Sequence, residues 1–194
     1  ADPDKGESED DAQFAGDYGF GATICGVPKG TKSNGSAGRW PRLSRILTAK
    51  TALTINCPVF KRHSQPGVTG ALKNVYGMID IPEQYHNPKN GPNVVNNFLP
   101  QLYALPAIRN SISLTIMDAL IGIITGDTGD RSDTFPKRII LAQDPVAMDS
   151  YALDLLNQLR AAINLGPDST ALTGWLDRAA ELGLGSRKYS LIQV

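Results

Sequence analysis

Short apolar runs that alternate with helical segments constrain the fold of this chain more than any other feature. Three β-rich apolar runs are spaced along the sequence, at residues 52–60, 112–118 and 138–142. An amphipathic segment, 94–105, separates the first two runs. The third run leads straight into Asp144-Pro145, an N-cap and first-turn pair that begins a helix reaching to about residue 163. This alternation predicts an α/β fold, a mixed sheet with helices packed on it in a layered sandwich.

Weaker patterns predict the remaining elements. We expect Pro100 to interrupt the helix at 94–105, and Pro106 to end it. A turn and a second short segment are expected after Asp118, and 138–142 is expected to be a buried strand. The other expected elements are strands at 22–25 and 189–194 and helices at 42–50, 70–77 and 169–182.

Charge and length limit the domain organisation and the class of partner. The 194 residues carry 19 basic and 19 acidic side chains, so a zero net charge gives no reason to expect a nucleic-acid partner. No apolar run approaches the roughly 18 residues that cross a bilayer, so the chain is not expected to be transmembrane. Residues 1–17 hold seven acidic residues against one lysine, which predicts a disordered acidic tail before a single domain at 18–194. The functional alternative for the tail is an arm that covers a basic site.

Two cysteines are too few to hold an iron–sulfur cluster. Cys57 falls in a β-rich apolar run, where a buried free thiol is the commoner interpretation. A Cys25–Cys57 disulfide is the alternative, and it requires an oxidising compartment.

Basic and amide side chains gather after the first apolar run and form the strongest candidate site. They are Lys61, Arg62, His63, Lys73, Asn74 and His86. Ligands of open α/β sheets collect beyond the carboxyl ends of strands. Lysine, histidine and asparagine together suit a carboxylate or phosphate, so these residues predict a site for a small anion. The alternative is a solvated basic loop.

Acidic residues near predicted strand ends form a second candidate group. Asp118 ends the second apolar run and is a candidate to take a proton or bind a cation. Capping explains Asp144 fully. Asp149, in the first turns of the same helix, either faces the sheet edge or favours the helix dipole.

Several motifs, taken in order, resemble the domain of unknown function 362 family over about residues 45–190. They are Ile55-Asn-Cys-Pro-Val-Phe-Lys-Arg-His63, Gly67-Val-Thr-Gly-Ala-Leu-Lys-Asn-Val-Tyr-Gly77, His86, Leu114-Thr-Ile-Met-Asp-Ala-Leu120, Asp144-Pro-Val-Ala-Met-Asp149 and Ala180-Glu-Leu-Gly-Leu-Gly185. The family occurs in bacteria and archaea and is largely uncharacterised. Some members are exported by the twin-arginine route and some carry ferredoxin-like segments.

The resemblance also implies what this chain lacks. Members have a further α/β portion with a Lys-Pro-Asn-like motif before this region, so we expect the chain to be the C-terminal part of a longer protein. Relatives often show Gly-Pro after the aspartate-ended strand, where this chain has Gly126-Asp-Thr-Gly129. No iron–sulfur motif carries over. Export is slightly favoured over a cytoplasmic location.

Two functions of different classes follow. The first is an enzyme or ligand-binding domain for a small anionic ligand, with a metal ion left open. Lys61, His63, Lys73 and Asn74 would bind the ligand, and His86 and Asp118 would be catalytic. The alternative is a non-catalytic assembly or interaction subunit of a redox-linked complex, in contact with the missing N-terminal portion or a partner chain.

Overall fold

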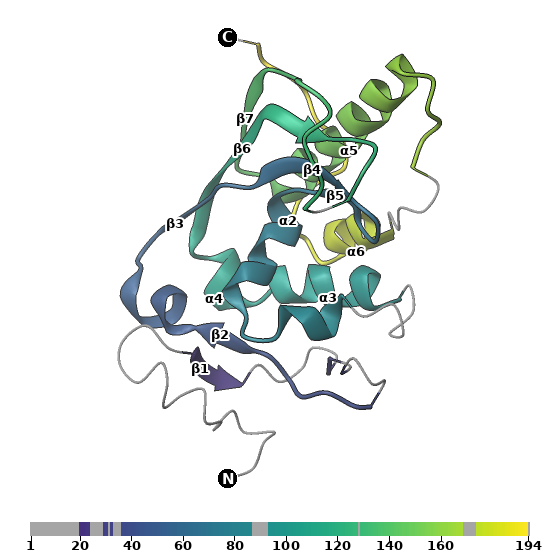
Figure 1. The fold of residues 1–194 in the computed structure, drawn as a ribbon. Coiled ribbons are helices and arrows are strands. Elements are labelled where there is room, and N and C mark those ends of the chain that lie inside the picture. The colour runs from purple at the N-terminus through teal and green to yellow at the C-terminus, as the bar shows by residue number, and fades with distance from the viewer. Residues whose placement is uncertain are drawn as a thin grey trace.

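The computed structural model describes residues 20–23, 29–30, 32, 36–86, 93–127, 129–168 and 174–193 (Figure 1). The expected acidic tail, 1–17, lies outside them. In the described part a mixed five-stranded sheet carries helices packed against it, as the alternation of apolar runs predicts.

The long strand β6, Ile112–Ile123, organises the sheet. Along one edge it pairs in parallel with β3, Thr54–Asn56, and then with β4, Val59–His63. On the other edge it pairs antiparallel with β7, Arg138–Ala142. The short strand β5, Gly67–Thr69, continues the sheet as the antiparallel hairpin partner of β4. A separate two-stranded sheet joins β1, Phe20–Thr23, to β2, Arg42–Ser44.

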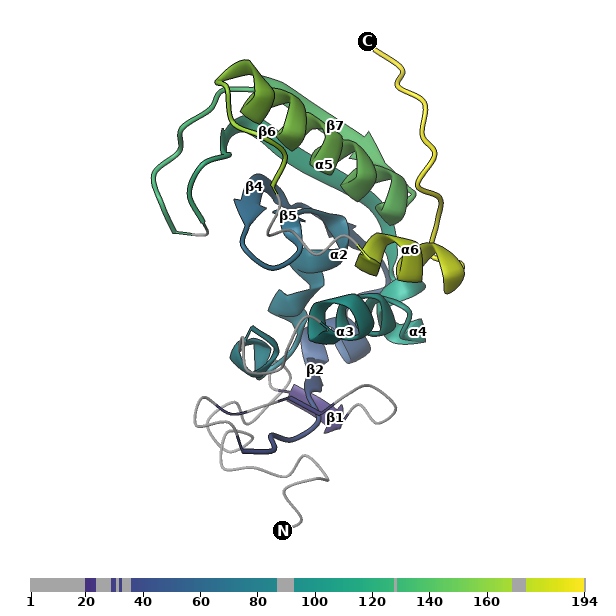
Figure 2. The same cartoon turned by 90° about the vertical axis from the view of Figure 1, so that its right-hand side faces the viewer.

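Helices cover one face of the main sheet, and Figure 2 shows α5 running along β6 and β7. The helices are α2 (Ala71–Asn74), α3 (Asn93–Tyr103), α4 (Pro106–Arg109), α5 (Pro145–Ala162) and α6 (Gly174–Glu181). Two short 3₁₀ helices follow α2, at Val75–Met78 and Pro82–Tyr85. None of the described helices is long and apolar enough to cross a bilayer.

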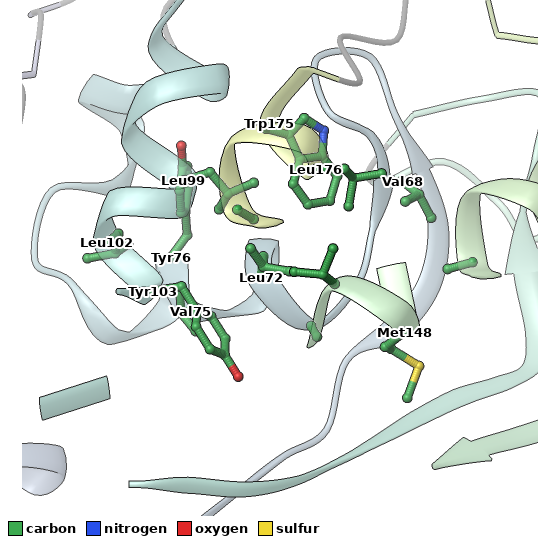
Figure 3. Packing of buried hydrophobic residues seen from close by; sticks show 14 of the residues in the cluster. Val68, Leu72, Val75, Tyr76, Leu99, Leu102, Tyr103, Met148, Trp175 and Leu176 are labelled. Atoms are coloured by element: carbon green, nitrogen blue, oxygen red, sulfur yellow. The ribbon is translucent and has the colours of Figure 1, made fainter. Parts of the chain in front are cut away.

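The core lies between this sheet face and the helices (Figure 3). Trp175 and Leu176 of α6 are fully buried beside Leu72, Leu99 and Val68. The indole Nε1 of Trp175 donates to the carbonyl oxygen of Pro66 at 3.0 Å, so the one polar atom of this large side chain is satisfied inside the core.

The other face of the sheet is apolar and uncovered. Side chains directly opposite in register point to the same face, which places Val59, Asp118 and Ile139 side by side. The outer face also carries Ile55, Leu120 and Leu141, and each of these apolar side chains is about half exposed or more. Figure 1 shows no described helix on that side of β6 and β7.

At three places the secondary structure differs from what the local sequence pattern predicts. The helix expected at 42–50 is wrong in its first half, because Leu43 is buried and bridges Ile79 as part of strand β2, and only Ile46–Lys50 is helical, as a π-helix. The turn expected after Asp118 is wrong, because β4 and β7 pair with both edges of β6 and extend it to Ile123. Pro100 is buried inside an uninterrupted α3, where its carbonyl still accepts from the Ala104 N–H at 2.9 Å.

The apolar run 52–60 forms two strands that are divided at Pro58, which lacks an N–H for the ladder. Three further expectations need correction. Cys57, in the gap between these strands, is exposed rather than buried. The expected buried strand 138–142 is an edge strand with an exposed outer face, and residues 189–193 form no strand. Cys25, the other half of the proposed disulfide, lies outside the described residues.

Candidate functional site

Lys73 and His86 form the centre of a basic cluster. The Lys73 Nζ lies 2.6 Å from His86 Nε2, although the two residues come from α2 and from the residue after the 3₁₀ helix Pro82–Tyr85. The ammonium also lies 3.7 Å from the centroid of the Tyr76 ring. Lys73 is 7% exposed, a burial that lysine rarely reaches without a carboxylate partner.

His63 completes the cluster from strand β4. Its ring stacks on that of His86 with centroids 5.5 Å apart. The backbone N–H of Gln65 donates to His63 Nδ1 at 3.2 Å, and the Gln65 side chain donates to the His86 carbonyl at 2.7 Å. The β4–β5 turn therefore bonds to the imidazole of His63 and to the backbone of His86.

Backbone contacts define which nitrogen of each imidazole carries the proton. The Nδ1 of His86 lies 2.8 Å from the carbonyl oxygen of Pro82, which can only accept, so Nδ1 is the donor. In a neutral ring the Nε2 lone pair then faces the Lys73 amine. His63 is the reverse, because its Nδ1 accepts from a backbone N–H, and its neutral ring carries the proton on Nε2.

Lys61 and two unpartnered hydroxyl groups lie beside the cluster. Lys61 of β4 stands directly opposite Thr69 of β5, so their side chains share one face of the hairpin. The hydroxyl groups of Thr69 and Tyr76 are buried and have no hydrogen-bond partner within the described residues. Buried polar atoms are rarely left unsatisfied in folded proteins, so both hydroxyl groups can donate to a bound ligand.

Burial shifts the ionisation of the cluster toward its neutral forms. Burial first, and then the charge of Lys61, lowers the pKa of the Lys73 amine to about 7. Burial followed by the charge of Lys73 lowers the pKa of His63 to about 4, and the same two causes lower the pKa of His86. Asp127 acts in the opposite direction on both histidines but less strongly.

Two of the expected anion ligands have structural partners instead. Arg62 forms a 2.6 Å ion pair with Asp168 and also donates to the Gly126 carbonyl. The Asn74 amide donates to Asn56 Oδ1 at 2.8 Å, and Asn56 in turn donates to the carbonyl of Ala71. The asparagine pair therefore ties α2 to β3.

Asp118 is not brought into contact with His86. It is exposed on the outer face of the sheet, where its Oδ1 accepts from the Leu120 N–H at 2.9 Å. Within the residues the structure describes, no group of three or more His, Cys, Asp or Glu side chains could hold a metal ion.

The other two aspartates stabilise helix ends. Asp144 accepts from the Ala147 N–H at 2.8 Å, the cap expected from the sequence, and from the Ser186 N–H at 2.8 Å. Asp149 is fully buried and accepts from the backbone N–H groups of Ala71 and Leu72, which begin α2. A Cβ on Gly70 would lie 1.9 Å from the Asp149 carboxylate, so this contact requires glycine there.

The sequence that forms this site matches the model of a protein family. The family described as Domain of unknown function (DUF362) matches residues 29–154. The chain belongs to this family. No curated protein matches the chain, and no solved structure does. The match contains the whole basic cluster and the Asp144-Pro145 helix start but ends before Gly185.

The geometry separates the motifs of this DUF362 chain into two groups. The first group makes hydrogen bonds that hold α2 and α5 in place, and it consists of Asn56, Asn74, Asp144 and Asp149. In the basic cluster the Lys73 amine lies against an imidazole and an aromatic ring, and no carboxylate of the described residues pairs with it. We regard this buried amine as the feature of the motifs that folding alone does not explain.

Tyr76, Thr69 and Asp127 were not singled out from the sequence. Tyr76 follows Lys73 by three residues, a helical spacing that puts the two side chains on one face. The Gln65-Pro66-Gly67 turn between two β-rich runs indicates a hairpin, which would have placed Thr69 opposite Lys61. Asp127 gave no such signal, because it reaches the histidines only through tertiary folding.

Proposed function

We propose that this DUF362 domain binds a small anionic ligand, a carboxylate or phosphate compound, at Lys61, His63, Lys73 and His86. One observation carries the proposal. Basic side chains converge on a partly buried point, and within the described residues neither lysine forms an ion pair with a carboxylate.

The cost of burying a charged amine at Lys73 favours the binding of an anion beside it. Burying an amine without a partner disfavours its charged form, and this is why the pKa of Lys73 falls to about 7. An anion would restore the charged form through charge-assisted hydrogen bonds. The unpartnered hydroxyl groups of Thr69 and Tyr76 add two donors for its oxygen atoms.

Calorimetry with inorganic phosphate and with malonate as probes tests the proposal. We expect the wild-type protein to bind at least one probe and Lys73→Met to lose most of the affinity. Lys188→Met is the matched control, because Lys188 is exposed and lies outside the cluster. Equal binding by wild type and Lys73→Met would contradict the proposal, as would no binding of either probe.

The uncovered outer face favours a second function, an interaction role. All-parallel sheets occur almost only where both faces are covered, usually by helices. The pairs of β6 with β3 and β4 are the parallel part of this mixed sheet. The occupant that fits is an amphipathic helix whose apolar side carries one lysine or arginine. The apolar side would cover Val59, Ile139 and Leu141, and the cation would meet the exposed Asp118 among them.

Designed helical peptides test this second function. Two amphipathic peptides differ only at the centre of the apolar side, one with lysine and one with glutamate. Fluorescence anisotropy should show that the wild-type protein prefers the lysine peptide and that Asp118→Lys prefers the glutamate peptide. Equal binding of the two peptides, or none, would contradict a helix docked over Asp118.

A further inference from the structure

We propose that Lys73 is a nucleophile that forms an imine with a small carbonyl compound bearing a carboxylate or phosphate group. The inference rests on the anion site proposed above and names its substrate class. Lys61 would hold the anionic group away from the Lys73 nitrogen, and the Lys73 amine would attack the carbonyl carbon in its unprotonated form.

The surroundings of Lys73 suit an attacking amine better than a fixed cation. Its Nζ lies against an imidazole nitrogen and the face of an aromatic ring, and no carboxylate of the described residues pairs with it. The Pro82 carbonyl holds the proton of His86 on Nδ1, so Nε2 presents a lone pair to the amine. An amine placed beside a base within hydrogen-bond reach is the arrangement that activates nucleophiles.

The ionisation of the amine agrees with this geometry. A lysine with an ordinary pKa is almost wholly protonated at neutral pH and cannot attack. Burial and the nearby Lys61 lower the pKa of Lys73 to about 7, so a large fraction of the amine is free at neutral pH. Desolvation next to a second cation is a known way to activate a lysine for imine formation.

Imine formation at Lys73 needs only the amine, the carbonyl compound and a group that moves protons. The Lys73 nitrogen forms a bond to the carbonyl carbon, and the π electrons of the C=O bond move to its oxygen. His86 Nε2 takes one proton from the nitrogen and delivers it to the oxygen, which gives the carbinolamine. It then takes the second proton from the nitrogen and delivers it to the hydroxyl group. Water then leaves and the carbon–nitrogen double bond forms, with no oxidant or reductant consumed. The buried hydroxyl groups of Tyr76 and Thr69 are donors for the developing oxygen charge and for the anionic group.

Borohydride trapping tests the inference on the full chain. The protein is incubated with pyruvate as probe and reduced with sodium borohydride, which converts an imine to a stable secondary amine. Intact mass and peptide mapping should place the adduct on Lys73. Mapping needs no variant, so the test stands even if a substitution at Lys73 prevents folding. An adduct spread over exposed lysines such as Lys188, with Lys73 unmodified, overturns the inference.

Matched probes separate this inference from the anion site itself. Lactate has the carboxylate of pyruvate without its ketone, and acetone has a ketone without the carboxylate. We expect trapping with pyruvate at least tenfold above acetone, and protection of Lys73 by excess lactate. Binding of lactate without trapping of pyruvate would overturn the imine and leave the anion site standing. No binding of lactate, pyruvate or phosphate would overturn both.

His86→Gln gives an independent readout of the proton transfer. Glutamine preserves a polar group near Lys73 but does not exchange protons. The rate of trapping at saturating pyruvate should fall at least tenfold, and saturation keeps any change of affinity out of the comparison. The wild-type rate should rise with pH through about 7, following release of the Lys73 proton. A rate that rises only near the ordinary lysine pKa would contradict a nucleophile activated by this site.

Discussion

The buried amine of Lys73 links the stability of the domain to pH at the scale of a single residue. Below about pH 7 both the folded and the unfolded chain hold the proton, and the folded state bears the full penalty of a buried charge. Between about pH 7 and the ordinary value of 10.5, the unfolded chain holds the proton and the folded chain does not. Stability from this group therefore rises with pH across that window.

Lys73→Met should remove this pH dependence. We expect the variant to gain stability over wild type at pH 7 and to lose most of that advantage by pH 9.5, because it has no charge to desolvate. Urea denaturation at both pH values measures the difference, and Lys188→Met corrects for the change of one lysine. A wild-type-to-variant difference that is the same at both pH values would contradict a depressed pKa at Lys73.

Sulfate provides a second test at the same residue, because its charge does not change between pH 6 and pH 9. An anion bound at the cluster favours the protonated amine, so sulfate should raise the melting temperature more at pH 6 than at pH 9. Sulfate also stabilises proteins in general, through exclusion from their surfaces. The Lys73→Met variant measures that general effect and should show no excess at pH 6. An equal excess in the variant would place the anion elsewhere.

At the scale of elements, the short helix α2 depends on a carboxylate from α5. Asp149 accepts from the first two N–H groups of α2, across sequence separations of 78 and 77 residues. Four residues cannot sustain a helix by local propensity, since isolated helices need about 12 residues or more. The contact therefore fixes the backbone that carries Lys73.

Asp149→Ala should destabilise the domain more than Asp144→Ala does. Two buried N–H groups lose their acceptor, at a cost of about 3 kcal/mol. Asp144→Ala should cost about 1 to 2 kcal/mol, because its half-buried cap can be replaced in part by water. Urea denaturation gives both values. A larger loss for Asp144→Ala would mean that the α5 cap, and not the α2 contact, dominates.

The sequence predicts such features only where their cause is local. The Asp144-Pro145 cap follows from adjacent residues and is confirmed, as is the mixed α/β sheet, which follows from alternating apolar runs. The contact from Asp149 to α2 is not local, and the two interpretations offered for Asp149 both missed it. Asn74 was grouped with Lys73 because an amide donor suits an anion, and the hydrogen bond of its amide to Asn56 arises only in the folded chain. Nothing in the pattern of residues 112–124 reveals that strands would pair on both edges of β6.

At the scale of the whole molecule, the sheet has two faces of unlike role. The inner face packs Phe60, Met117 and Ala119 against the helices, and all three are fully buried. The outer face leaves Val59, Ile139 and Leu141 between 49% and 60% exposed. Exposed apolar patches of several hundred Å² mark interaction surfaces.

The two faces should respond oppositely to truncation. Leu141→Ala should change the free energy of unfolding by no more than about 0.5 kcal/mol, because its side chain has few partners to lose. Met117→Ala, next in sequence to Ile116, the register partner of Leu141, should cost about 3 kcal/mol through lost burial and a cavity. Leu141→Lys should also reduce the binding of the dye ANS, which reports exposed apolar surface. A loss at Leu141 as large as the loss at Met117 would mean that the outer face is already packed within the isolated chain. Unchanged dye binding in Leu141→Lys would place the exposed apolar surface elsewhere.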